Sequence, residues 1–150
     1  GGTLANVVAE YAEAKLDIRY TTMAEAAKAV EKVKAIVAKC YDDRTITELV
    51  EAGSHVYTPP METTEGVQRL YRFMKAQAEK LGQTVLGAMI VGGSADANYI
   101  CAEGVPTICS MGPAGVGPHS NNEYVFVKSF VERAQLTAMA IMHLDEMENY

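Results

Sequence analysis

Two glycine-rich loops contain most of the residues whose types and spacing could support chemistry. The first loop is Gly92-Gly93-Ser94, and the second runs from Gly112 to His119. Glycine lets the backbone approach a ligand closely, and free N–H groups at a helix start attract anions such as a carboxylate. Neither loop contains a GxGxxG or Walker A sequence, which argues against nucleotide binding. The first loop also fits a tight strand-to-helix turn with Ser94 or Asp96 as the helix cap.

His119 carries the strongest individual signal. It ends the second glycine-rich loop and lies outside any periodic apolar face, where a histidine is more often functional than structural. Neutral imidazole is a common zinc ligand, so metal binding is one hypothesis for this residue. A two-zinc site needs several ligands, however, and one histidine cannot complete it.

The elements expected before these loops are two strands and a helix. Apolar and polar residues alternate from Val7 to Tyr20, which predicts a long strand with one solvent-exposed face. Thr22 and Glu25 have the spacing of a capping box, so a helix is expected to follow them. A second strand is expected over residues 45–50.

A proline pair predicts where the chain divides. Thr58-Pro59-Pro60 is typical of a hinge, so we expect one domain over residues 1–58 and another over residues 59–150. In the second domain, helices and short apolar strands are predicted to alternate, which indicates an α/β layer. The expected helices cover residues 64–81 and 96–103, and the expected strands cover residues 85–91 and 106–109.

The last helix is predicted to be amphipathic. Ser129 and Glu132 have the spacing of a capping box, so the helix is expected to start near Ser129. Its apolar residues at helical spacing are expected to face the core. These are Phe130, Ala134, Ile141 and Leu144.

The composition is that of a folded protein and argues against several classes of partner. The net charge is -6, and the 13 Lys and Arg residues are spread through the chain, whereas nucleic-acid binding needs a clustered basic face. No apolar run approaches the ~20 residues of a membrane span. The three cysteines have no CxxC spacing and fit reduced, buried thiols, so a cytoplasmic location is expected.

Motifs in both expected domains resemble a single family. The second domain contains, in order, GG-x-x-D-A-N, G-V-P-T and G-P-x-G-x-G-x-H-S-x-x-E-Y-V. Upstream, GGT-x-x-NVV followed by D-x-R resembles the lid, or dimerisation, domain of that family. The sequence is therefore similar to the C-terminal portion of the co-catalytic zinc exopeptidase and deacylase superfamily. Its members include glutamate carboxypeptidase, acetylornithine deacetylase and succinyl-diaminopimelate desuccinylase.

The resemblance implies an α/β fold and a hydrolytic activity. The fold would be an incomplete ferredoxin-like lid domain followed by the C-terminal half of a zinc-peptidase catalytic domain. The intact enzyme would hold two zinc ions and cleave peptide or N-acyl amide bonds of small substrates. A zinc-bound water would be the nucleophile, and a carboxylate would take its proton. The resemblance also implies a homodimer formed through the lid.

The resemblance assigns roles to individual residues. His119 matches a zinc ligand, and Glu123 matches a glutamate that we interpret as a positioning residue. Asn6 matches a lid residue near the reacting carbonyl, where it would stabilise the developing oxyanion. Arg19 matches a lid residue that holds the substrate carboxylate, often in the partner subunit's site. Gly92, Gly93 and Ser94 match the loop that lines the substrate end of the cleft.

The sequence also departs from the family pattern. Ala95 stands where the family usually has Ser or Thr before the Asp, and Ser94 lies one place earlier. The family's bridging aspartate and its Glu-Glu pair with the general base have no counterpart in the sequence, and the H-x-D triplet at His143-Leu144-Asp145 follows the glycine-rich loops instead of preceding them as the family's metal motif does. We therefore expect the chain to be inactive alone and to need the missing N-terminal catalytic half as its partner.

Two other functions are compatible with the sequence. One is a non-catalytic dimerisation or small-ligand-binding module derived from the same family, which would have no reason to hold zinc. The other is a small anion-binding α/β protein, which would keep the glycine-rich loops without needing Asn6 and Arg19. A metal titration separates the first of these from an enzyme.

Overall fold

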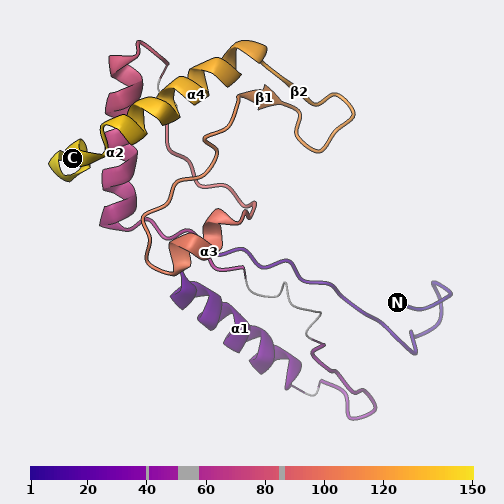
Figure 1. Cartoon of the computed structure of the whole chain (residues 1–150). Coiled ribbons are helices and arrows are strands. Elements are labelled where there is room, and N and C mark those ends of the chain that lie inside the picture. Colours follow the sequence, from indigo (N-terminus) through magenta and orange to yellow (C-terminus); the bar gives the residue numbers. More distant parts are fainter. Residues whose placement is uncertain (40, 51–57, 85–86) are drawn as a thin grey trace. The chain divides into compact units, whose positions relative to one another are not determined.

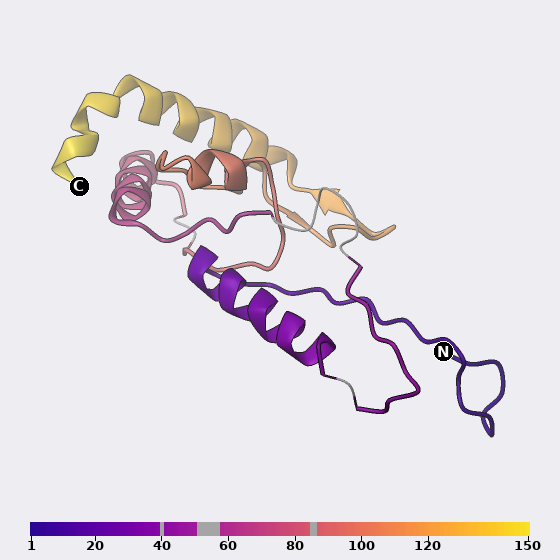
Figure 2. The same cartoon turned by 90° about the horizontal axis from the view of Figure 1, so that it is seen from below.

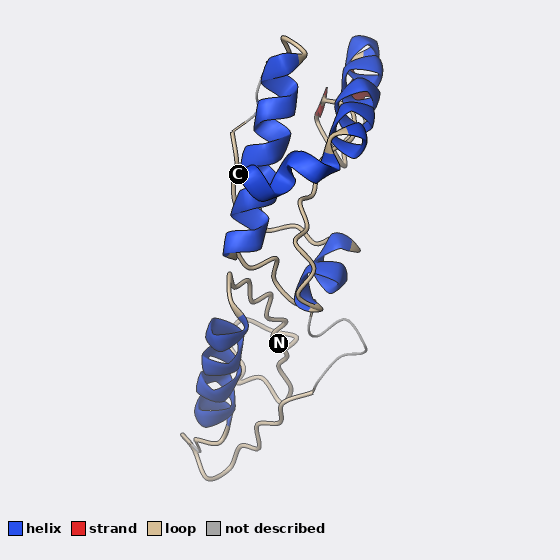
Figure 3. Cartoon of the chain, turned by 60° about the vertical axis from the view of Figure 1, so that its left-hand side comes forward, coloured by secondary structure: helices blue, strands red, loops and turns tan. Residues whose placement is uncertain are grey.

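The chain forms two compact units. The computed structural model describes residues 1–39, 41–50, 58–84 and 87–150 (Figure 1). The first unit is Gly1–Val50 and the second is Glu51–Tyr150, and each is described by itself. Most of the regular structure is helical, and the strands are short (Figure 3). Among the residues described, no helix is both long enough and apolar enough to cross a membrane.

Helix α1 (Met23–Val37) is the regular element of the first unit, and it begins where the capping pattern predicts. The Thr22 hydroxyl accepts a hydrogen bond from the backbone N–H of Glu25 at 3.1 Å. The Glu25 carboxylate in turn accepts from the Thr21 hydroxyl at 2.7 Å, and this bond holds the pKa of Glu25 below its usual value. The contact to Thr22 satisfies an N–H group that the first turn of a helix leaves unpaired, so the predicted cap is confirmed.

The two strands predicted for the first unit are not formed. Residues 7–20 and 45–50 belong to no strand, and apolar side chains in them are exposed, Val8 to 93%. Alternation determines which residues would share a face, but a strand also needs a neighbour that completes its backbone hydrogen bonds. The described residues of this unit include no such neighbour. The predicted long strand is therefore wrong here, and the ferredoxin-like arrangement of the lid is not confirmed.

Helix α2 (Glu65–Lys80) and the short helix α3 (Ala97–Ala102) confirm two helices predicted for the second unit. The Thr64 hydroxyl caps α2 by accepting from the N–H of Val67 at 3.3 Å. The helix ends before Gly82, whose φ of 64° lies in the left-handed region that glycine adopts readily. Caps and glycine stops act locally, which is why the sequence located these helices.

The core of the second unit lies where α4 (Val127–Met142) and the 3-10 helix η1 (Leu144–Asn149) pack on α2. Figure 2 looks along α2 and shows α4 crossing it. Phe73 of α2 is only 1% exposed, and its ring meets that of Tyr150 edge to face at 5.7 Å between centroids. Leu136 and Ala140 of α4 are buried as well. Lys80 and Glu146 form an ion pair of 2.7 Å between α2 and η1.

The prediction for the last helix was wrong in two respects. The helix begins at Val127, close to the predicted start, but Ser129 and Glu132 lie inside it and do not cap it, and the N-cap residue Phe126 makes no capping hydrogen bond through its side chain. The apolar residues expected to be buried are exposed. These are Phe130, Ala134, Ile141 and Leu144. The helix has apolar residues on more than one side, and periodicity alone does not determine which side meets α2.

The strands of the second unit also differ from the prediction. Residues 87–91 and 106–109 form no strand, and residues 85 and 86 of the first expected strand lie outside the described residues. Among the described residues, the strands that form are β1 (Gly115–Val116), inside the second glycine-rich loop, and β2 (Tyr124–Val125), which follows that loop. Short apolar runs become strands only when other strands flank them, so the expected α/β layer is not formed within the described residues.

Candidate functional site

Strands β1 and β2 form an antiparallel hairpin whose turn carries His119. Gly115 pairs with Val125, and Val116 pairs with Tyr124. A Cβ atom on Gly115 would lie 2.6 Å from the carbonyl oxygen of Tyr124, so the pairing requires glycine there. Gly117 has a φ of 71°, which also favours glycine. Hairpin geometry therefore explains part of the glycine content of this loop.

His119 is held in an uncommon backbone conformation. Its φ of 63° is left-handed, which costs a residue with a Cβ atom about 1 kcal/mol. Its backbone N–H donates to Oε2 of Glu123 at 3.3 Å. Ser120 braces the same turn, since its hydroxyl donates to the carbonyl oxygen of Gly117 at 2.8 Å and accepts from the N–H of Asn122 at 3.2 Å. The turn thus fixes the backbone of His119 and leaves the residue exposed.

Ser129 joins the root of this hairpin to the first turn of α4. The residue is only 6% exposed. Its hydroxyl accepts from the N–H of Ala114 at 2.9 Å and donates to the carbonyl oxygen of Phe126 at 2.6 Å. The N–H of Phe126 donates to the carbonyl oxygen of Ala114 at 2.9 Å. From sequence, Ser129 was interpreted as a helix cap, and its role as an anchor of the hairpin was missed. A serine three residues before a glutamate looks the same in the sequence whether it caps a helix or anchors a distant backbone group.

The anchoring role of Ser129 leads to a testable prediction. Ser129→Ala leaves the Ala114 N–H without its partner, so we expect the second unit to lose about 1–2 kcal/mol of its free energy of unfolding. Hydrogen exchange at the amides of Ala114 and Phe126 should accelerate in this variant. The Ser129→Thr variant keeps a hydroxyl, so its free energy of unfolding and its exchange rates should stay closer to those of the unmodified chain. Chemical denaturation and amide exchange measure the two effects. Unchanged exchange in the alanine variant would contradict the assignment.

The first glycine-rich loop is exposed and is anchored by Asn98. Gly92-Gly93-Ser94 lies in no helix or strand. Asn98 is 8% exposed, and its side chain accepts from the N–H of Ala95 at 2.9 Å and donates to the carbonyl oxygen of Pro59 at 2.7 Å. Sequence reasoning gave Asn98 no role, although its place in the D-A-N motif was a signal.

The cap predicted for α3 is confirmed in its position at Asp96 but not in its hydrogen bond. Asp96 occupies the N-cap position, but its side chain makes no capping hydrogen bond. Its φ of -59° and ψ of -25° are helical, whereas a capping residue is usually extended so that its side chain turns back to the free N–H groups.

Asn6 and Arg19 both lie exposed in the first unit, but not on one strand. Asn6 belongs to a turn, and Arg19 lies in the segment of residues 7–20, which was predicted to be a strand and is not one. The Arg19 guanidinium contacts Oδ2 of Asp17 through Nη2 at 2.8 Å. This hydrogen-bonded pair lowers the pKa of Asp17 and raises that of Arg19. Arg19 therefore has a local partner while remaining open to solvent.

The described residues do not fit a zinc ion on their own. They contain no group of three or more His, Cys, Asp or Glu side chains that could hold a metal. The Glu123 carboxylate is engaged with the backbone of His119. Cys101 is half-buried and Cys109 is exposed, which contradicts the expectation of a buried thiol at Cys109. Since a protein zinc site needs three or four ligands, His119 by itself is not a metal centre.

Comparisons with known proteins agree with the motifs. A sequence profile described as peptidase family M20/M25/M40 matches residues 5–143. Carboxypeptidase G2 of Pseudomonas sp. (strain RS-16) is 27% identical over 145 residues, which are 95% of this chain and 34% of that protein. The chain thus spans about a third of the length of this relative. No solved structure matches the chain.

Proposed function

Because the chain belongs to peptidase family M20/M25/M40, we propose that it is the C-terminal portion of a zinc-dependent hydrolase. The substrates would be small molecules with a peptide or N-acyl amide bond. The observation that carries the proposal is the family match over residues 5–143, which includes the second signature whole and the upstream one from Ala5 onward, in their expected order. The similarity to a carboxypeptidase supports peptide-type substrates. We call the longer natural polypeptide that would contain this chain the full-length enzyme.

The proposed roles of the site residues come from the family resemblance, and their exposure is compatible with these roles. His119 would contribute one zinc ligand, and residues outside this chain would supply the others. Support comes from its exposed place in a turn that hydrogen bonds hold in one conformation. Arg19 would hold a substrate carboxylate through its guanidinium fork, and Asn6 would donate to the reacting carbonyl. The open backbone at Gly92-Gly93-Ser94 would line the substrate end of the cleft.

Two partners are proposed for the chain, an N-terminal catalytic half and a second subunit. Its main partner would be the N-terminal catalytic half, because the chain lacks the family's Glu-Glu pair and its H-x-D triplet, His143-Leu144-Asp145, belongs to no metal-binding group of three or more side chains among the described residues. A homodimer through the first unit would bring Asn6 and Arg19 to the second subunit's site. Size measurement of the full-length enzyme tests the dimer.

We expect the isolated chain to show negligible hydrolysis and to bind zinc weakly. One imidazole leaves a zinc ion mostly hydrated, and catalysis by two metals needs both ions fixed. Zinc stoichiometry after dialysis, together with turnover of dipeptides and N-acyl amino acids, measures both effects.

Tight binding of two zinc ions by the isolated chain would contradict this prediction. The alternative function is a non-catalytic module, and the lack of a metal-binding group among the described residues is expected of both functions. The module predicts that the full-length protein also holds no zinc. The same titration on that protein therefore decides between the enzyme and the module.

A further inference from the structure

Asn98 joins two segments of the second unit that are far apart in the sequence. It is the buried residue of the short helix α3, only 8% exposed. Its Oδ1 atom accepts from the N–H of Ala95, directly after the first glycine-rich loop, at 2.9 Å. Its Nδ2 atom donates to the carbonyl oxygen of Pro59, 39 residues earlier, at 2.7 Å. One side chain therefore ties the loop to the proline pair Pro59-Pro60.

The two partners of Asn98 require an uncharged amide between them. A backbone N–H can only donate and a carbonyl oxygen can only accept, so the bridging side chain needs an acceptor and a donor on separate atoms. The polarity of the partners also fixes which way the amide group faces. A carboxylate would lack the donor, and a charge at a site this buried would be costly.

The proline pair is a stiff point of attachment. Neither proline has an N–H group, so the pair offers only its carbonyl oxygens for hydrogen bonding. The rings fix the backbone φ angles, and Pro60 also keeps Pro59 extended. The pair lies near the start of the second unit, where the chain arrives from the first. Because this segment bends little, a loop tied to it has a defined position.

The first glycine-rich loop offers its backbone to a ligand. A Cβ atom on Gly93 would meet no heavy atom within 4 Å among the described residues, so their packing does not require glycine there. The N–H groups of Gly93 and Ser94 donate no hydrogen bond within the described part of the chain. Unpaired N–H groups without a side chain in front of them suit a carbonyl or carboxylate oxygen. The position of the loop then decides whether these groups reach a ligand.

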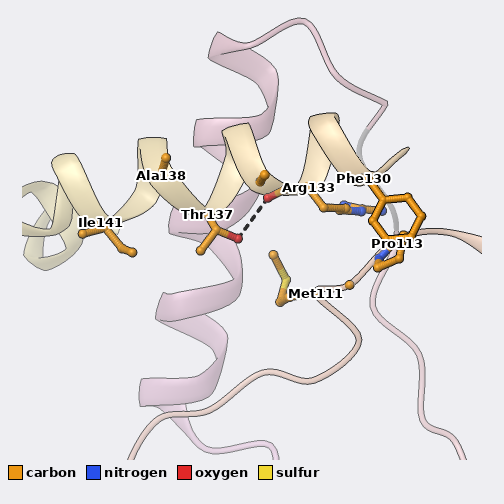
Figure 4. A pocket seen from close by; sticks show the side chains of 9 residues that line it. Met111, Pro113, Phe130, Arg133, Thr137, Ala138 and Ile141 are labelled. Atoms are coloured by element: carbon orange, nitrogen blue, oxygen red, sulfur yellow. Dashed lines mark hydrogen bonds between the residues drawn. The ribbon is translucent and has the colours of Figure 1, made fainter. Parts of the chain in front are cut away.

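The hollow beneath α4 is chemically unlike this loop. It measures about 510 Å³ and lies between α4 and the segment at residues 111–113 (Figure 4). Its side chains are apolar apart from Arg133 and Thr137, and the Thr137 hydroxyl donates to the carbonyl oxygen of Arg133 at 3.0 Å. A substrate with a peptide or N-acyl amide bond needs several polar groups that converge on it. The loop suits such a substrate better than the hollow does.

We propose that Asn98 is a positioning residue for substrate binding, which places the first glycine-rich loop by tying it to Pro59. The inference rests on the proposed function, in which this loop lines the substrate end of the cleft. Without the bond to Pro59, the loop keeps its local contact at Ala95 but loses its attachment to the stiff segment. Substrate binding then weakens, whereas the chemical step, which takes place at other residues, is retained.

Asn98→Asp in the full-length enzyme separates the two bonds. The carboxylate still accepts from the N–H of Ala95 but cannot donate to Pro59. KM should rise by about fivefold to tenfold while kcat stays within about twofold, since the lost contact holds the substrate equally before and during the reaction. Asn149→Asp is the matched control, because it makes the same change at an exposed residue of η1 in the same unit. The control should leave both kinetic constants unchanged.

Two measurements on the isolated chain do not depend on catalysis. Hydrogen exchange at the Ala95 amide should stay slow in Asn98→Asp and accelerate in Asn98→Ala, which removes both bonds. Nuclear magnetic resonance relaxation of the Gly93 and Ser94 amides should give lower order parameters in both variants than in the unmodified chain. Asn98→Ala introduces no charge, so it replaces Asn98→Asp in every comparison if the carboxylate prevents folding.

Gly93→Ala separates the inference from the proposed function. This variant adds a Cβ atom in open space and leaves the bonds of Asn98 in place. If Gly93→Ala raises KM and Asn98→Asp does not, the loop binds substrate without being tied to Pro59, and the inference alone fails. If neither variant changes KM, the loop does not line the cleft, and its proposed role fails together with the inference.

Two further outcomes would overturn the inference. One is a smaller folded fraction of Asn98→Asp in which the remaining enzyme keeps its KM, because Asn98 would then only stabilise the fold. The other is unchanged order parameters at Gly93 and Ser94. If the full-length protein shows no turnover at all, the proposed function fails, and the order parameters alone decide whether Asn98 places the loop.

Discussion

Replacing His119 by alanine in the full-length enzyme is expected to abolish turnover while leaving the fold intact. The residue lies exposed in a hairpin turn, so its removal costs little packing. Loss of a first ligand should reduce zinc affinity and rate by at least about 100-fold, since even outer partners of metal ligands contribute 10–100-fold. Zinc content, turnover and the circular dichroism spectrum of the purified variant measure these effects.

Two further variants make this result specific. His119→Gly removes the imidazole and also accepts the left-handed φ of 63°, so any loss in this variant is not due to backbone strain. His143→Ala is the matched control, because the His143 ring lies 2.9 Å from the carbonyl oxygen of Met139 at the end of α4. If His119→Ala retains its zinc and its rate, the assignment of His119 as a ligand is wrong.

The second large effect is expected from Arg19→Lys in the full-length enzyme. A guanidinium holds a carboxylate by two parallel hydrogen bonds, which the ammonium of lysine cannot reproduce. KM should therefore rise by about 10-fold or more for substrates with a free carboxylate, which corresponds to the 1.5–3 kcal/mol of a charged hydrogen bond. The corresponding amides or esters should be affected much less. Steady-state kinetics on matched substrate pairs measure the difference.

Arg44→Lys is the control for general effects of charge in the same unit. Arg44 is exposed and pairs with Asp42 at 2.6 Å, much as Arg19 pairs with Asp17. The pair holds the pKa of Asp42 at about 2, so both arginines have a charged local partner. The Arg44 variant should leave KM unchanged for both substrate types. Equal changes for acids and amides in the Arg19 variant would identify Arg19 as an ordinary surface charge.

The sequence predicted the helices well because their ends depend on nearby residues. Thr22 and Thr64 each accept a hydrogen bond from an N–H three residues ahead, and Gly82 permits the turn that ends α2. These signals lie within a few residues of the structure they determine. The family could also be recognised from sequence, since its motifs depend on residue order alone.

The strands and the buried side of α4 could not be predicted in the same way. A strand over residues 7–20 or 106–109 depends on other strands that complete its hydrogen bonds, and the described residues contain none beside them. For α4, the sequence showed that Phe130 and Ile141 share an apolar side. It could not show that Leu136 and Ala140 would be the residues that meet α2.

In the candidate site too, features that depend on neighbouring residues could be predicted from sequence, whereas features that depend on distant contacts could not. His119 and the glycines could be selected from sequence because their types and order suggest a ligand loop. The residues that hold these loops in place could not be selected from sequence. Ser129 forms a hydrogen bond with Ala114, and Asn98 forms one with Pro59, across sequence separations of 15 and 39 residues. A side chain that anchors a distant backbone group has no signature in its own neighbourhood.

The exposed segment at residues 87–91 has a consequence for how cells handle this polypeptide. Met89, Ile90 and Val91 carry no charge, are exposed and belong to no strand. Short uncharged segments with β-branched residues and no proline are the type that assembles into intermolecular sheets. Gly92, Gly93, Ser94 and Ala95 follow directly, so no charge or proline within these four residues limits such assembly on that side. When the chain is produced alone, this segment should therefore favour inclusion bodies, capture by chaperones and rapid proteolysis.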